Sequence, residues 1–143
     1  MKTGYEEKFM EIQGKMVSLC LETVEGVAVS KIYMYESMKE HSRSFNAFCE
    51  VDGVPKYLNE IDIEEKRIDK LLHIGTVDIM NELRNLCKEY EVPRPTEIKA
   101  TYDVETGGFE MECEYDTIDV SSGEALNIWW EELKAAADAL AQP

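Results

Sequence analysis

The feature that most constrains the fold is a strict alternation of side chains on either side of the glycine pair Gly107-Gly108. Apolar and polar residues alternate over positions 96–104, and the same pattern returns over 109–116. Successive side chains of a strand point to opposite faces of a sheet, so a period of two predicts two half-buried strands. Two glycines between them suit a tight turn. The sequence therefore predicts an antiparallel hairpin over residues 96–116.

A second hairpin is predicted earlier in the chain. Residues 27–36 are rich in β-branched and aromatic side chains, which favour a strand, and the polar stretch 39–44 follows as a turn. Residues 45–51 then alternate up to Asp52-Gly53, where the chain turns again.

The orientation of the first of these strands decides which aromatic residues the sheet exposes. Tyr33 and Tyr35 share one side of the strand, and Ile32 and Met34 share the other. We expect the tyrosines to face outward, beside Phe48 of the second strand, although the pattern also permits the reverse.

Three helices are predicted around the hairpins. Apolar residues recur at spacings of three and four over positions 5–23 and 68–90, and again in a last helix that carries Trp129 and Trp130. The chain is of a length that fits one domain, residues 1–143. The expected order is α-β-β-α-β-β-α. We therefore predict an α+β fold of two layers, with an antiparallel sheet of about four strands and the helices on one face.

Composition and cysteine spacing narrow the class of protein. Hydrophobic residues make up 44% of the chain, which is too many for a disordered protein. The four cysteines form no Cys-x-x-Cys pair, so we expect buried, reduced thiols and no metal or other cofactor. The apolar runs fall far short of the roughly 20 residues that cross a bilayer, and residues 1–7 lack a signal-peptide core. We expect a cytoplasmic protein.

Net charge restricts the partners. The chain has 15 basic and 30 acidic residues, for a net charge of −15. Between Ala100 and Leu133 there are ten acidic residues and no lysine or arginine. Such a field repels nucleic acid and anionic membranes and accelerates association with a basic protein. We expect a protein partner with a basic surface.

Part of this charge is ordered along one strand. Alternate residues from Glu110 to Asp116 are acidic and point the same way, roughly 6.5 to 7 Å apart. That spacing is within the screening length of about 8 Å at physiological salt. A solvated face kept soluble by charge would also explain the row, but glutamate is a poor strand former and no lysine stands on the same strand. We predict a partner-binding face. Its residues are Tyr33, Tyr35, Phe48, Glu50, Glu97, Glu110, Glu112, Glu114 and Asp116.

Five short segments occur in an order shared with a known family. They are Lys31-Ile32-Tyr33-Met34-Tyr35-Glu36, Pro95-Thr96-Glu97-Ile98-Lys99, Gly107-Gly108-Phe109, Glu114-Tyr115-Asp116 and Trp129-Trp130. In this order they resemble the YezG-type immunity (antitoxin) family of bacterial proteins over nearly the whole chain. The resemblance implies a small, acidic, cytosolic protein that binds and neutralises a cognate toxin domain, often a nuclease.

The expected function is therefore that of a monomeric immunity protein without catalytic activity. The sequence holds no nucleophile elbow, glycine-rich phosphate loop or His-Glu-x-x-His motif. Two alternatives remain. One is an enzyme or small-ligand domain with a pocket between the long helix and the sheet. The other is an acidic homo-oligomer whose aromatic face pairs with itself, which the acidic row opposes.

Overall fold

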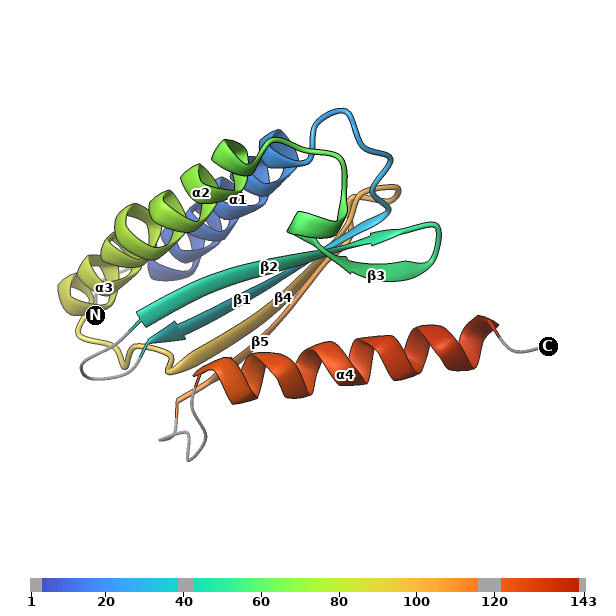
Figure 1. Cartoon of the computed structure of the whole chain (residues 1–143). Coiled ribbons are helices and arrows are strands. Elements are labelled where there is room, and N and C mark those ends of the chain that lie inside the picture. The colour runs from blue at the N-terminus through green and yellow to red at the C-terminus, as the bar shows by residue number, and fades with distance from the viewer. Residues whose placement is uncertain (1–3, 39–42, 116–121, 142–143) are drawn as a thin grey trace.

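The computed structural model describes residues 4–38, 43–115 and 122–141 (Figure 1). Along the chain, one helix precedes three strands, and a helical stretch, two more strands and a last helix follow. The fold is α+β, as predicted. Its elements are α1 (Tyr5–Thr23), β1 (Lys31–Met38), β2 (Arg43–Val51), β3 (Val54–Tyr57), a short 3-10 turn η1 (Leu58–Glu60), α2 (Glu65–His73), a π-helical segment η2 (Ile74–Ile79), α3 (Met80–Glu89), β4 (Glu97–Asp103), β5 (Phe109–Glu114) and α4 (Ser122–Ala141).

The strands form one antiparallel sheet in the order β3-β2-β1-β4-β5. Both predicted hairpins are present, because β1 pairs with β2 and β4 with β5. The prediction of four strands, in the order α-β-β-α-β-β-α, is wrong by one: after the Asp52-Gly53 turn, β3 returns along β2. Pro55 conceals this strand in the sequence, since proline cannot donate to a ladder and is confined to sheet edges.

Helices cover both faces of the sheet, so the predicted two-layer arrangement is also wrong. On one face lie α1 and the continuous rod formed by α2, η2 and α3, and on the opposite face lies α4 (Figure 1). The reason is found in β1, whose residues from Ile32 to Met38 are all buried. A strand buried on both sides needs a layer on each side.

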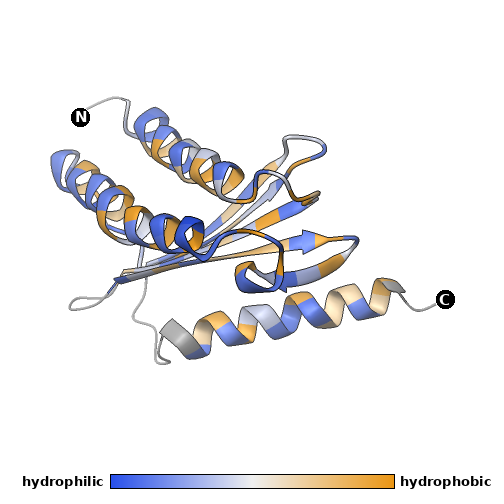
Figure 2. Ribbon diagram, turned by 45° about the horizontal axis from the view of Figure 1, so that its top comes forward, coloured by the Kyte–Doolittle hydropathy of each residue, from blue (hydrophilic) through white to orange (hydrophobic). Residues whose placement is uncertain are grey.

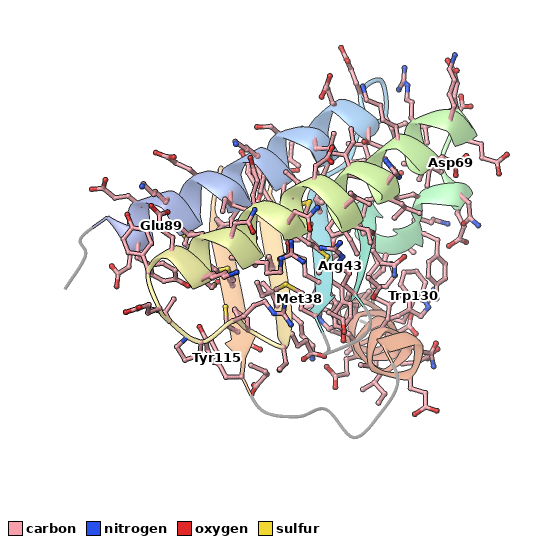
Figure 3. All side chains as sticks on the ribbon, turned by 90° about the vertical axis from the view of Figure 1, so that its left-hand side faces the viewer. Met38, Arg43, Asp69, Glu89, Tyr115 and Trp130 are labelled. Atoms are coloured by element: carbon pink, nitrogen blue, oxygen red, sulfur yellow. The ribbon has the colours of Figure 1, made fainter. Side chains whose placement is uncertain are left out.

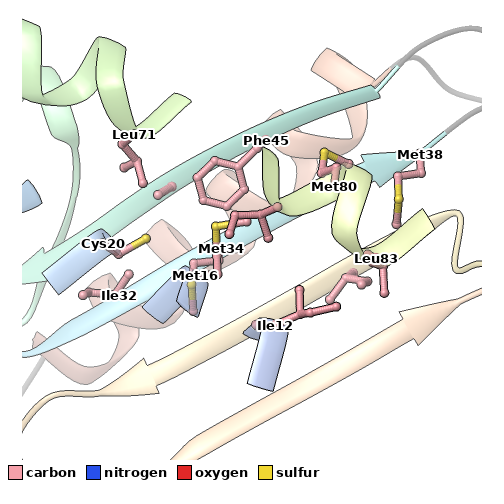
Figure 4. Close-up of a cluster of buried hydrophobic side chains, with 14 of the residues drawn as sticks. Ile12, Met16, Cys20, Ile32, Met34, Met38, Phe45, Leu71, Met80 and Leu83 are labelled. Carbon is pink, nitrogen blue, oxygen red and sulfur yellow. The ribbon is translucent and has the colours of Figure 1, made fainter. Parts of the chain in front are cut away.

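The larger core lies between the sheet and the helices α1 and α3. The predicted stripe of α1 is confirmed at Phe9, Ile12 and Met16, which are buried, and the outer sides of the helices are hydrophilic (Figure 2). Alternate residues of the strands complete this core, with the Phe45 ring near its centre (Figure 4). The face of each strand that the alternation assigned to the interior therefore packs against these helices.

The helical rod comes closest to β2 at Gly75. A Cβ atom at this position would lie 2.6 Å from Cδ1 of Phe45, whose side chain is only 2% exposed. Because the phenylalanine ring is enclosed by the core, it has no free space into which to move. Glycine is therefore the residue that lets the rod contact the sheet here.

We predict that Gly75→Ala lowers the free energy of unfolding by about 1–3 kcal/mol through overpacking against Phe45. The matched control is Gly14→Ala on the exposed side of α1, where an added Cβ meets nothing within 4 Å. That variant should gain about 0.5 to 1 kcal/mol from helix propensity alone. Urea unfolding measures both values, and equal effects of the two substitutions would contradict the close contact.

One carboxyl group lies inside the larger core. Glu36 of β1 is 1% exposed, and its Oε1 atom has no hydrogen-bond partner among the described residues. Burial raises the pKa of this carboxyl group from 4.5 to about 7, while the neighbouring side chain of Gln13 of α1 acts in the opposite direction. Removing a carboxylate from water disfavours its charged form, so Glu36 takes up a proton at higher pH than an exposed glutamate does.

Because the folded state holds this proton more tightly than the unfolded state, stability falls as the pH rises from about 4.5 to about 7. The loss from this group is about 3 kcal/mol, from a pKa difference of roughly 2.5. We predict that Glu36→Gln removes this pH dependence and is more stable than the wild type at pH values above 7. Glu11→Gln, at an exposed position of α1, should retain the wild-type pH profile in the same urea titrations.

Candidate functional site

Two tryptophans attach α4 to the sheet. Trp129 contacts three rings of the sheet, and its ring centroid lies 5.9 Å from that of Tyr33, 6.3 Å from that of Tyr35 and 6.0 Å from that of Phe48. Trp130 points toward the sheet edge, where it stacks on Tyr57 of β3 with centroids 3.9 Å apart. Both tryptophans contact Phe48 of β2, and from there Trp129 extends to β1 and Trp130 to β3, in keeping with their separation of about 100° on the helix.

The prediction that the tyrosines face away from the larger core is correct, but the prediction that they are exposed is wrong. Tyr33, Tyr35 and Phe48 are 6%, 0% and 1% exposed because α4 covers them. Their rings form the second core of the protein. The aromatic part of the predicted partner-binding face is therefore closed in this structure.

Two of the predicted acidic site residues are engaged by the same tyrosines. Tyr33 Oη donates a hydrogen bond to Glu50 Oε2 at 3.2 Å, and Ser30 Oγ donates to the other carboxylate oxygen at 2.8 Å. Tyr35 Oη donates to Glu97 Oε2 at 2.6 Å. Burial and the adjacent carboxylates raise the pKa of both tyrosines. Glu50 and Glu97 therefore hold the second core together, and they are not free charges.

The sheet face that α4 covers in part also carries exposed acidic residues, on the strand farthest from α4. Glu110, Glu112 and Glu114 of β5, which we call the glutamate row, are all exposed. Helix α4 lies beneath β1, β2 and β3, and in Figure 3 Trp130 on α4 and Tyr115 at the end of β5 stand on opposite sides of the view. Asp116, the fourth predicted member of the row, lies outside the described residues.

One lysine lies next to the glutamate row. The strand register places Lys99 of β4 directly opposite Glu112, and Lys99 Nζ lies 3.9 Å from Glu97 Oε1. No lysine stands on β5 itself, and the position of Lys99 beside it cannot be read from the sequence, because only the register shows which residues of the neighbouring strand lie opposite. Within β4 and β5, Lys99 is therefore the one ammonium group beside the three exposed carboxylates, and it also pairs with Glu97.

A cavity of about 580 Å³ lies elsewhere, between the C-terminal part of α4 and the ends of β1, β2 and β3. Its wall has polar groups of both charges, and Leu133 is among its apolar residues. The polar groups belong to Lys31, Tyr33, Glu50, Asp52, Lys134 and Asp138. This cavity is not the pocket of the alternative reading, which would lie between the long helix and the sheet. That region is filled by the side chains of the larger core.

The cysteines are free thiols, as expected. Cys20, Cys49 and Cys87 are buried and Cys113 is partly buried, and burial raises the pKa of the Cys49 thiol to about 11. Within residues 4–38, 43–115 and 122–141, no three histidine, cysteine or acidic side chains gather in a way that would hold a metal ion. In the same residues, no helix has the length and apolar character needed to cross a membrane.

We predict that Trp129→Ala lowers the free energy of unfolding by about 3 to 5 kcal/mol, since it removes the ring that joins α4 to β1 and β2. Loosening α4 should also bring the pKa of Tyr33 and Tyr35 closer to the ordinary value, which ultraviolet titration measures. The control, Ile128→Ala, changes the preceding residue, which is 49% exposed, and should shift stability by less than about 0.5 kcal/mol.

Comparison with known proteins gives no assignment. No protein-family model matches the chain, and no curated protein matches it either. The resemblance to YezG-type immunity proteins stays a prediction from the motifs quoted above.

Proposed function

We propose that the protein is an immunity protein (antitoxin) that neutralises a toxin domain by docking the glutamate row onto a basic surface of that domain. The observation that carries the proposal is the exposure of Glu110, Glu112 and Glu114 on the half of the sheet face that α4 leaves uncovered. The motif order of the YezG-type family supports the toxin as the kind of partner.

Electrostatics favours this mode of binding. Side chains two apart on a strand are separated by roughly 6.5 to 7 Å, so the three carboxylates repel one another within the screening length. A partner with lysine or arginine side chains relieves this repulsion, and the long-range field of a chain with net charge −15 accelerates the encounter. A basic partner therefore associates faster and matches the charge of the glutamate row.

The form of the partner follows from the charge. A nuclease holds nucleic acid in a basic cleft, and an acidic protein seated in that cleft excludes the substrate. We propose a cytoplasmic, monomeric binding protein with no chemistry of its own. Like-charged rows on two copies of this chain repel each other, which favours the monomer.

The cavity beside α4 favours a second candidate function, the binding of a small ligand. Its volume, about 580 Å³, lies within the range of ligand pockets. Two of its polar groups, however, are already bonded to each other, since Tyr33 donates to Glu50. The lysines Lys31 and Lys134 would then provide the contacts to an anionic group of the ligand.

To test the proposal, the tagged protein is used to capture its partner from the native cell, and the association rate of the purified pair is measured against salt. We predict a basic partner, and an association rate that falls at least about tenfold in the triple variant Glu110→Lys, Glu112→Lys, Glu114→Lys, with a weaker dependence on salt.

The matched control reverses the same number of charges on the opposite layer. Glu7, Glu11 and Glu22 of α1 are exposed, and their change to lysine alters the net charge by the same amount. We expect this control to slow association much less than the β5 variant does. Equal rates for the wild type and the β5 variant would show that the glutamate row is not the docking surface.

A further inference from the structure

The two edges of the sheet are built differently. At one edge, β3 has four residues, contains Pro55, and is covered where Tyr57 stacks on Trp130 of α4. At the other edge, β5 has six residues with no proline and no lysine, and β4 is its one neighbour among the described strands. Proline, short length and a covering helix are the devices that protect an edge from pairing. β5 has none of these three, but its exposed glutamates carry charge, which also protects an edge against a strand of like charge.

The register shows which backbone groups of β5 point outward. Asp103 donates its N–H to the carbonyl of Gly108, and Thr96 donates its N–H to the carbonyl of Glu114. In an antiparallel pair the hydrogen-bonded positions alternate, so the backbone groups of Glu110 and Glu112 also point toward β4. The N–H and C=O groups of the residues between them, Phe109, Met111 and Cys113, therefore point to the outer edge.

The side chains of β5 divide in the same alternation. The glutamate row lies on the face that bears α4, while Phe109, Met111 and Cys113 lie on the face toward α1 and are only partly buried. The partners of Cys113 and Met111 on the inner neighbour β4, Ile98 and Ala100, are 0% and 1% exposed, whereas Tyr102, the partner of Phe109, is itself only partly buried. The difference follows from position, because a residue on an edge strand has a neighbouring strand on one side only.

We propose that the outer edge of β5 is where the basic partner adds an antiparallel strand, with lysine or arginine toward the glutamate row and apolar side chains toward Met111. The inference rests on the proposed function and gives its binding mode. Such a strand forms hydrogen bonds with the outward N–H and C=O groups of Phe109, Met111 and Cys113 and covers their partly buried side chains. On the other face, its basic side chains pair with the three exposed carboxylates.

Charge selects this occupant over a second copy of the chain. Two β5 strands paired edge to edge would bring glutamates from both copies onto one face, and like charges opposite each other destabilise a strand pair. A strand with alternating basic residues reverses the sign of that interaction, since opposite charges across a pair contribute roughly 0.2–1 kcal/mol each. The glutamate row thus rejects self-pairing and accepts a basic strand.

The test uses the full protein and a synthetic peptide of alternating lysine and valine that matches the six residues of β5 in length. Binding is followed by amide hydrogen exchange, residue by residue. We expect the amides of Phe109, Met111 and Cys113 to exchange at least about tenfold more slowly with the peptide, because they gain partners. Glu110 and Glu112, already bonded to β4, should change little.

Two methylated peptides provide the control, and both keep the charge. In an antiparallel pair, the valines that face Met111 turn their amides toward β5, and the lysines turn theirs away. Methylation of the valine amides should therefore abolish binding, whereas methylation of the lysine amides should leave it within about threefold.

Each other outcome overturns the edge proposal. If the peptide does not bind, or if both methylated peptides bind equally well, no strand is added. If it binds while the three outward amides exchange as before, contact is made by the face alone, and the docking of a toxin on the glutamate row still stands. If those amides are already protected in the free protein and its mass is that of a dimer, a second copy occupies the edge. The proposed function itself would be refuted by a different result: an association rate with the native partner that is the same for the wild type and for the β5 charge-reversal variant.

Discussion

Burial of β1 on both of its faces is the constraint on which the rest of the structure depends. This central strand contributes Ile32 and Met34 to the larger core and Tyr33 and Tyr35 to the second core. The first pair needs α1 and α3, and the second pair needs α4, because tyrosine rings of this size lose a large hydrophobic contribution if they stay in water. A fold with one helical layer would leave the second pair exposed.

The same constraint decides where the free surface lies. Trp130 stacks on Tyr57 at the β3 edge, which draws α4 to that side of the sheet. The helix therefore closes one half of the face and leaves the β4–β5 half to the solvent. The exposed residues of β5 there are acidic, whereas the carboxylates of Glu50 on β2 and Glu97 on β4 are bonded to the two tyrosines that α4 covers. Position relative to α4 separates structural carboxylates from carboxylates that are free to bind.

Much of the fold could be predicted from the sequence, because period-two and helical patterns report burial directly. The strands predicted at 96–104 and 109–116 are present at 97–103 and 109–114. The helix predicted at 5–23 is α1, and the helix predicted at 68–90 is the rod of α2, η2 and α3. The placement of α4 could not be predicted, since an amphipathic helix shows that it packs but not on which face. One signal was present: residues 32–35 are apolar or aromatic at every position, which is typical of a strand buried on both sides.

The site was predictable only in part, for a related reason. Alternation on β5 places Glu110, Glu112 and Glu114 on one face without knowledge of any other strand, and the structure exposes all three. Whether Tyr35 is exposed, and which residue lies beside Glu112, depends on the neighbouring strands and helices. The sequence alone does not show the register that places Lys99 opposite Glu112.

The edge position of β5 adds a further consequence that sequence alone did not reveal. A row of glutamates in the middle of a sheet would offer only its face to a partner. At an edge the same row stands beside backbone groups with which no other described strand pairs, so charge can select a strand while the backbone binds it. At the β3 edge Pro55 and α4 hinder pairing with any strand, whereas at the β5 edge the glutamates hinder pairing only with a strand of like charge.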